Sequence, residues 1–244
     1  THASNVTGAI TPLTDILPAA RAAGALVVLD TCQSAAHLPL DFAALSAAGV
    51  DAMVLSSHKM LGPTGVGALV ATEELLDAMP AVLTGGSMIE VVTMESSTYM
   101  PAPARFEAGS QPLAQAAGWR ASVGYLARLG MDRLHAGEQV LTRRVLDGLA
   151  AIEGVRLLGP ADTTQRLGVV AFTIDGVHPH DVGQVLDAAG VAVRTGHHCA
   201  QPIHAHFGTA SSSRVSFGPT STSAEADRFL EAVASVRSYF RRRA

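Results

Sequence analysis

The stretch that decides the fold reads Leu55-Ser56-Ser57-His58-Lys59-Met60-Leu61-Gly62-Pro63-Thr64-Gly65. The apolar run 52–55 at its start is typical of a buried strand, and the Gly-Pro-Thr-Gly turn at its end cannot continue regular structure. The pattern therefore places Lys59 in a bend at the carboxyl end of a strand, where open α/β sheets bind their ligands. A lone lysine is most often a surface cation. Here Ser56 and His58 offer groups suited to an anion, and we interpret Lys59 as a Schiff-base lysine.

The residues around this stretch alternate between helix and strand patterns. Residues 12–23 have helical spacing, and 25–30 form an apolar run that closes on a carboxylate, as in a buried parallel strand. A helix over 41–48 and strands over 52–55 and 66–71 are predicted next. This β-α-β order favours a parallel sheet with helices on its faces. Residues 1–11 are predicted to be a loop, and the irregular stretch 84–111 is predicted to be functional or interfacial.

The second half of the chain has a different pattern. Long helices are predicted over 113–129 and 131–152, and shorter elements follow: strands over 169–174, 191–194 and 214–217 and helices over 180–189 and 224–240. Such an order is typical of a compact α+β unit. We therefore predict two domains, 1–130 and 131–244.

Composition excludes several classes of protein. The chain has 244 residues, is 48% hydrophobic and carries a net charge of -4, so it offers a sizeable core and no nucleic-acid footprint. No apolar run reaches the roughly 18 residues of a membrane span. Two cysteines are too few for a disulfide framework or a four-ligand zinc site, and a reducing cytoplasm is the expected location. Because the chain starts among polar residues without methionine, we expect it to be part of a longer protein.

A second constellation reads Arg194-Thr195-Gly196-His197-His198-Cys199-Ala200-Gln201-Pro202. The pattern predicts that Cys199 is an exposed and reactive thiol, because imidazolium groups and loop amides favour the thiolate. His204 and His206 follow closely, so a zinc site remains an alternative from spacing alone.

Four further residues have two interpretations each. Asp30, at the end of its strand, is either a helix cap or the partner of a protonated pyridine nitrogen. Gln33 and Asn5 could bond a cofactor or only the backbone. Arg214 could clamp a substrate carboxylate or be a surface charge.

These motifs, together with Arg105-Phe106-Glu107-Ala108-Gly109, resemble the cysteine desulfurases of the Suf type, which are pyridoxal-phosphate enzymes of the class V aminotransferase superfamily. The resemblance runs in collinear order over the whole chain. The lysine motif marks the superfamily, and the Arg-Thr-Gly-His-His-Cys motif marks the desulfurase and selenocysteine-lyase branch. The implied fold is α/β, fold type I, with a partial large domain containing a mostly parallel sheet and a small C-terminal α+β domain that carries the catalytic cysteine.

The resemblance also implies roles. Lys59 binds pyridoxal 5'-phosphate covalently and moves protons, and Cys199 takes sulfur from L-cysteine as a persulfide, leaving alanine. The other implied contacts are to the cofactor (Asp30, Gln33, Asn5, Ser56, His58 and, across a homodimer, Ser110), to the substrate (Arg214, Arg194 and Asn5) and to a Suf-pathway sulfur acceptor (His180). Iron–sulfur cluster assembly is the implied purpose, and no resident metal, nucleic acid or membrane is expected.

The family has a further N-terminal part with a cofactor-stacking histidine and a phosphate-binding threonine loop, which this chain lacks. Where the family has an aromatic-rich stretch after the Arg214 position, this chain has Gly218-Pro219-Thr220-Ser221-Thr222. Three alternatives stay open: a selenocysteine lyase, a non-catalytic remnant that serves as a binding partner, and a zinc hydrolase built on His197, His198 and Cys199.

Overall fold

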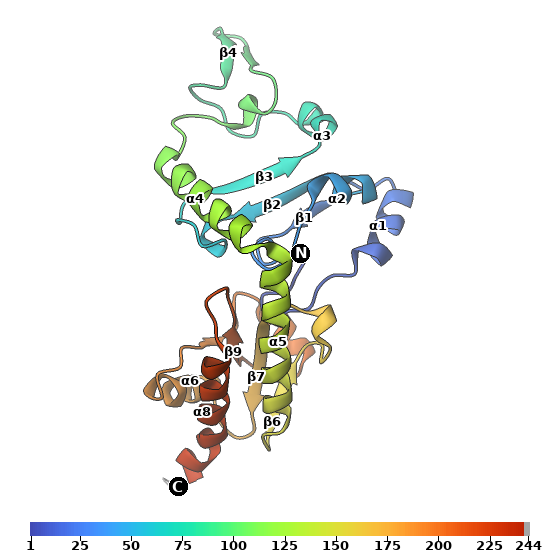
Figure 1. Cartoon of the computed structure of the whole chain (residues 1–244). Helices are drawn as coiled ribbons and strands as arrows, with labels where there is room; N and C mark the ends of the chain where they lie inside the picture. The colour runs from blue at the N-terminus through green and yellow to red at the C-terminus, as the bar shows by residue number, and fades with distance from the viewer. Residues whose placement is uncertain (242–244) are drawn as a thin grey trace. The chain divides into compact units, whose positions relative to one another are not determined.

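The computed structural model describes residues 1–241, which divide into two compact units (Figure 1). The first unit contains Thr1 and residues 12–129, and the second contains residues 2–11 and the chain from Gly130 onward. Within residues 1–241, no helix combines the length and the apolar character that crossing a membrane requires.

The first unit is built around a three-stranded sheet of order β1-β2-β3. Its elements are α1 (Leu13–Ala22), β1 (Val28–Asp30), α2 (Phe42–Ala48), β2 (Ala52–Ser56), the 3-10 helix η1 (Ser57–Lys59), β3 (Gly67–Ala71), α3 (Glu73–Ala78), β4 (Ile89–Val92), β5 (Ser97–Tyr99), η2 (Ala104–Phe106) and α4 (Leu113–Leu129). Local sequence fixes several helix ends. Asp41 caps α2 by accepting from the amides of Ala43 and Ala44, and Gly49 ends it with a φ of 114°.

The sheet of the first unit is mixed, with one parallel and one antiparallel pairing. β1 and β2 run parallel, as α2 between them allows, but β3 pairs antiparallel with β2. A parallel return needs a crossover of a dozen or more residues. Only residues 57–66 join β2 to β3, and they hold a single 3-10 turn, so the chain folds straight back.

One face of this sheet is better covered than the other. Leu29 and Met53 are buried in a small core with Leu17 of α1 and with Val50, whereas Val28 and Leu69 are 59% and 47% exposed. β4 and β5 form a separate antiparallel hairpin. Its side chains are almost all exposed, and Met94 at its turn is 96% exposed. The hairpin therefore adds little to the core of the unit.

The second unit is a four-stranded antiparallel sheet of order β6-β7-β9-β8 with three long helices. Its elements are α5 (Met131–Ala150), β6 (Val155–Leu158), η3 (Thr163–Gln165), β7 (Val169–Ile174), α6 (Pro179–Ala188), β8 (Arg194–Gly196), α7 (Gln201–His206), β9 (Ser212–Ser216) and α8 (Ser223–Arg241). Figure 1 shows α5 and α8 in front of β7 and β9. Between helices and sheet lies the main core, where Phe172 meets Phe229 edge to face with ring centroids 5.7 Å apart.

Residues 2–11 pack with the second unit, although the domain predicted from the sequence, 1–130, includes them. The Leu167 amide donates to the Gly8 carbonyl at 2.9 Å, and the Ile10 amide to the Gln165 carbonyl at 2.9 Å. Gly8 is required there, because its φ is 72° and a Cβ would lie 2.6 Å from the Val169 carbonyl oxygen. These backbone contacts fix Asn5 in the second unit.

Candidate functional site

Several of the side chains expected to hold a cofactor gather at the carboxyl ends of β1 and β2. Asp30 ends β1, Ser56 ends β2, and His58 and Lys59 follow in η1. The parallel register pairs Asp30 with Val54, so the two strand ends meet at one edge of the sheet. His58 and Lys59 are exposed there, which leaves their polar ends available to a ligand.

Asp30 is held in its charged form. Partial burial would raise its pKa, but hydrogen bonds from Cys32 and the nearby charge of Lys59 outweigh it, so the Asp30 pKa lies below its ordinary value. The Cys32 amide donates to Asp30 Oδ1 at 2.9 Å. Burial and the Asp30 carboxylate raise the pKa of the Cys32 thiol. Cys32 is therefore less reactive than an ordinary exposed cysteine.

A close backbone approach fixes the bend that carries Lys59. The amides of Met60 and Gly62 both donate to the Ser57 carbonyl, at 2.8 and 3.0 Å. A Cβ on Gly62 would lie 2.2 Å from Ser57 Oγ and 3.0 Å from Ser57 O. A side chain at position 62 would therefore collide with Ser57, so the turn requires glycine there. This close packing holds the turn in one conformation and so positions Lys59.

The remaining first-unit candidates lie apart along the chain. Gln33 is half-buried in the turns after β1, close behind Asp30. Ser110 is exposed and lines a separate cavity of about 370 Å³ with Ser87, Ala104, Glu107, Gly109, Gln111 and Leu113. The structure thus groups Asp30, Ser56, His58 and Lys59, with Gln33 in the adjoining turns.

The second unit presents Cys199 on a strained loop after β8. Cys199 is exposed, and it lines a cavity of about 420 Å³. His198 and Cys199 both have left-handed backbones, with φ of 53° and 63°. Such residues cost about 1–3 kcal/mol each and persist only where surrounding contacts hold them.

Arg194 and Asn5 supply those contacts, and Arg214 in turn holds Asn5. Arg194 Nη2 donates to Cys199 Sγ at 3.2 Å, and Asn5 Nδ2 donates to the His198 carbonyl at 2.5 Å. Arg214 Nη1 donates to the Asn5 carbonyl at 2.7 Å. Burial lowers the pKa of Arg214, and the charge of Arg194 lowers it further. The structure thus brings Asn5, Arg194, Cys199 and Arg214 together in the second unit.

The histidines near Cys199 do not form a metal site. Within residues 1–241, no group of three or more His, Cys, Asp and Glu side chains is arranged to hold a metal ion. Instead His198 Nε2 and His204 Nε2 each lie 3.0 Å from the Ser212 hydroxyl. The zinc alternative has no ligand set there. The sequence alone predicts no role for Ser212. The pattern that could have indicated one is the serine run 211–213, which follows His204 and His206 in the sequence.

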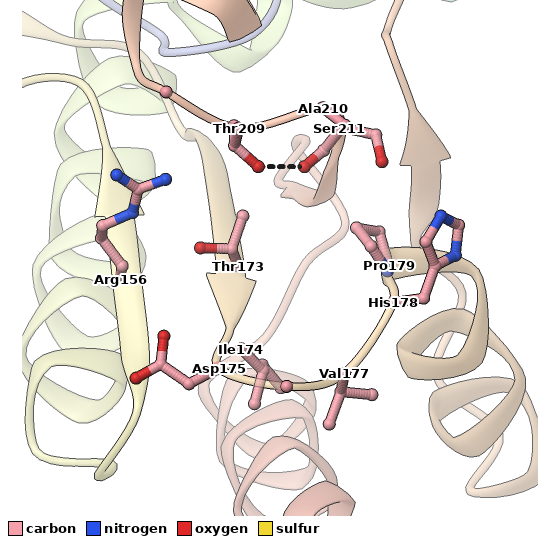
Figure 2. Close-up of a pocket in the computed structure, with 12 residues that line it drawn as sticks. Arg156, Thr173, Ile174, Asp175, Val177, His178, Pro179, Thr209, Ala210 and Ser211 are labelled. Carbon is pink, nitrogen blue, oxygen red and sulfur yellow. Dashed lines mark hydrogen bonds between the residues drawn. The ribbon is translucent and has the colours of Figure 1, made fainter.

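A second cavity of the same unit, about 650 Å³, lies between the β6–β7 pair, the turn into α6 and residues 208–211. Figure 2 shows Thr173 between Arg156 and His178 across this cavity. His178 caps α6 by accepting from the His180 amide at 3.2 Å. His180 is exposed in the first turn of α6, next to the cavity lining.

The chain matches one known family. The model of the class V aminotransferases matches residues 1–229, and the chain belongs to this family. The lysine-bearing turn and the cysteine loop both lie inside the match.

The similar proteins include several that are named cysteine desulfurases. A relative from Mycobacterium leprae (strain TN), named probable cysteine desulfurase 2, is 50% identical over 241 residues, which cover 99% of this chain and 57% of the relative. The apo structure of a cysteine desulfurase from Thermococcus onnurineus NA1 aligns with a TM-score of 0.91 at 34% identity, over 97% of this chain and 59% of that one. The chain spans less than two thirds of the length of these relatives.

A second similar structure bears on the cofactor. The protein named C-DES is 25% identical with a TM-score of 0.80, over 96% of this chain and 58% of its own, and it holds glycine covalently linked to its PLP cofactor. The residues of the first unit fit that cofactor, because Asp30 is an ionised carboxylate suited to a pyridinium nitrogen and Lys59 is an exposed amine close by.

Proposed function

We propose that the protein is a pyridoxal-phosphate-dependent cysteine desulfurase, which converts L-cysteine to L-alanine and passes the sulfur to Cys199. One observation carries the proposal. An exposed thiol stands on a strained loop with a guanidinium 3.2 Å from its sulfur, which is the setting of a nucleophilic cysteine. The family of the chain and the names of its relatives support the same activity.

The first unit would hold the cofactor. Bound pyridoxal phosphate supplies an electron sink for substrate carbon atoms. Asp30 would pair with the ring nitrogen, Gln33 with the ring oxygen, and Ser56 and His58 with the phosphate. Lys59 would bind the cofactor through its amine and then move a proton at the substrate Cα.

Cys199 would carry the sulfur transfer. Its thiolate attacks the substrate sulfur, so that an S–S bond forms while the substrate C–S bond breaks. The electron pair of the broken bond goes to the substrate Cβ, which takes up a proton and gives alanine. The transfer balances without an added oxidant, because the protein thiol becomes a persulfide as the amino acid loses its thiol.

Arg214, Arg194 and Asn5 would bind the substrate. In the described part of the chain, Arg214 Nε is buried without a hydrogen-bond partner, so one donor of this guanidinium is unsatisfied. Arginine is the side chain suited to bind a carboxylate through two parallel hydrogen bonds. Asn5 accepts a hydrogen bond from Arg214 and donates one to the His198 carbonyl. These two bonds would couple substrate binding to the loop of Cys199.

We further propose that the protein acts as a homodimer, passes its persulfide to a Suf-pathway acceptor for iron–sulfur cluster assembly, and works in the cytoplasm. The exposed apolar hairpin β4–β5 supports a second copy as partner, with Ser110 reaching its cofactor. The exposed His180 supports docking of the acceptor at α6. Both cysteines are free thiols, as a reducing compartment maintains.

The test measures alanine and sulfide formed from L-cysteine by the full-length protein, supplied with pyridoxal phosphate and a thiol reductant. The parent should form both products, and Cys199→Ala should bind the cofactor yet form neither. Lys59→Ala should lose the covalently held cofactor. Equal turnover by Cys199→Ala and the parent would refute the persulfide role, and turnover on selenocysteine alone would identify a lyase instead.

A further inference from the structure

Three buried side chains form a hydrogen-bonded chain behind the Cys199 loop. His198, Ser212 and His204 are 2%, 0% and 1% exposed. They come from the loop after β8, from β9 and from α7. The Ser212 hydroxyl lies 3.0 Å from Nε2 of each imidazole. His204 Nδ1 continues the chain to the Ala200 carbonyl at 3.2 Å.

The donor and the acceptor of each of these hydrogen bonds can be assigned from their chemistry. A carbonyl oxygen only accepts, so His204 Nδ1 carries the proton that it donates to Ala200. In the neutral ring His204 Nε2 is then bare and accepts from the Ser212 hydroxyl. Because a hydroxyl has one proton, the Ser212 oxygen must accept from the other side. The proton of His198 therefore lies on Nε2.

The state of His198 agrees with this assignment. Its Nδ1 is buried and has no hydrogen-bond partner in residues 1–241, which a bare acceptor nitrogen tolerates better than an N–H group. Burial lowers the pKa of His198 to about 4, and the charges of Arg214 and Arg194 contribute to this shift. His198 is thus neutral at pH 7 and has one defined tautomer.

We propose that Ser212 and His204 are positioning residues for the Cys199 thiol, acting through the imidazole of His198. The hydrogen bond from Ser212 anchors the His198 ring, while Asn5 anchors its backbone carbonyl. The ring and the carbonyl are then both fixed, and the left-handed backbone of His198 and Cys199 is held between them. This geometry keeps the sulfur at Arg194. The inference deepens the proposed function, on which it rests for the role of Cys199.

The first test reads the protons directly in the parent protein. Proton–nitrogen NMR spectra of the histidine rings distinguish a protonated nitrogen from a bare one. We expect His198 to be bare at Nδ1 and His204 to be bare at Nε2, with the assignment made from the signals lost in His204→Gln. A His198 ring protonated on Nδ1 would reverse the chain and overturn the proposal.

The second test measures the reactivity of the Cys199 thiol. In a Cys32→Ala background Cys199 is the single cysteine, and its alkylation by iodoacetamide at pH 7 can be timed. Ser212→Ala loses the hydrogen bond that anchors the His198 ring as well as the one to His204. It should slow alkylation by about three- to tenfold, since the sulfur leaves Arg194 more of the time. Ser212→Thr keeps the hydroxyl and should recover the parent rate.

Ser213→Ala is the matched control. Ser213 is equally buried on β9, but its hydroxyl bonds the Pro179 carbonyl at 3.3 Å and not the histidines. It should alkylate at the parent rate. Equal rates for the parent and Ser212→Ala, or equal slowing in Ser212→Ala and Ser213→Ala, would overturn the positioning role. Neither test needs cofactor or L-cysteine, so a protein that passes both and forms no alanine refutes only the desulfurase assignment.

Discussion

Arg194 Nη2 lies 3.2 Å from Cys199 Sγ, five residues away across the turn that follows β8. The two residues share one short segment, so the contact depends on the fold of that loop and not on a distant element. A guanidinium that donates to sulfur stabilises the thiolate form, which is the nucleophile. The relationship ties the arginine and the cysteine of one motif to a single chemical task.

Replacing this arginine should make the thiol less reactive. In a Cys32→Ala background, Arg194→Ala should slow alkylation of Cys199 at pH 7 by roughly tenfold, as expected for a charge-assisted hydrogen bond at an exposed site. Arg228→Ala is the matched control, because Arg228 is an arginine of the same unit that bonds the Ala189 carbonyl. Equal rates in Arg194→Ala and Arg228→Ala would contradict the role of Arg194.

Gly62→Ala should disturb the turn that carries Lys59. The added Cβ meets Ser57 at 2.2 Å from its hydroxyl and 3.0 Å from its carbonyl, and Ser57 is fully buried. Overpacking of this kind costs about 1–3 kcal/mol in the free energy of unfolding. Urea denaturation followed by the fluorescence of Trp119, the single tryptophan, measures the change in the first unit.

Gly124→Ala provides the comparison for that measurement. Gly124 lies within α4, in the same unit as Trp119, and a Cβ there meets only Arg128 Nη1, at an ordinary contact distance of 3.5 Å. The substitution should be neutral or stabilise by up to about 1 kcal/mol. A Gly62→Ala protein as stable as the parent would show that the turn relaxes without cost.

The sequence predicts elements well where the signal is local. The run into Lys59, the long helices 113–129 and 131–152, and the strand 169–174 all have a periodicity or a turn chemistry of their own, and the structure confirms these elements. α7 escaped prediction because six residues with a proline and two histidines show no apolar stripe. β4 and β5 escaped because almost no side chain of theirs is buried, so no alternation marks them.

Long-range contacts account for the rest. The direction of β3 depends on the length of its connection, and the place of residues 2–11 depends on backbone bonds to residues 165 and 167. The pairing of Ser212 with two histidines joins segments 8 and 14 residues apart. No local pattern encodes such contacts. The histidine spacing alone suggested zinc, because spacing does not show what a side chain faces.

Asp30→Asn should weaken retention of the cofactor. The amide keeps the size of the carboxylate but removes the charge that would face a pyridinium nitrogen. A hydrogen bond to a charged group contributes about 1.5–3 kcal/mol, so retention should fall by roughly ten- to a hundredfold. Cofactor content after dialysis of the full-length protein measures this. Asp15→Asn, at an exposed position in α1, is the control. Full retention in Asp30→Asn would exclude the pairing.

His198 should make the second unit less stable in mild acid. Burial holds its pKa at about 4 in the folded protein, against an ordinary value of 6.5, so the unfolded chain binds the proton first as the pH falls. The stability from neutral His198 is therefore complete above about pH 6.5 and is lost progressively down to about pH 4. Between pH 7.5 and pH 5 the loss from this group alone is about 2 kcal/mol. Urea denaturation followed by circular dichroism at the two pH values measures it. His198→Gln cannot take up the proton and should lose about 2 kcal/mol less over that interval than the parent, whereas equal losses would mean that His198 charges freely in the fold.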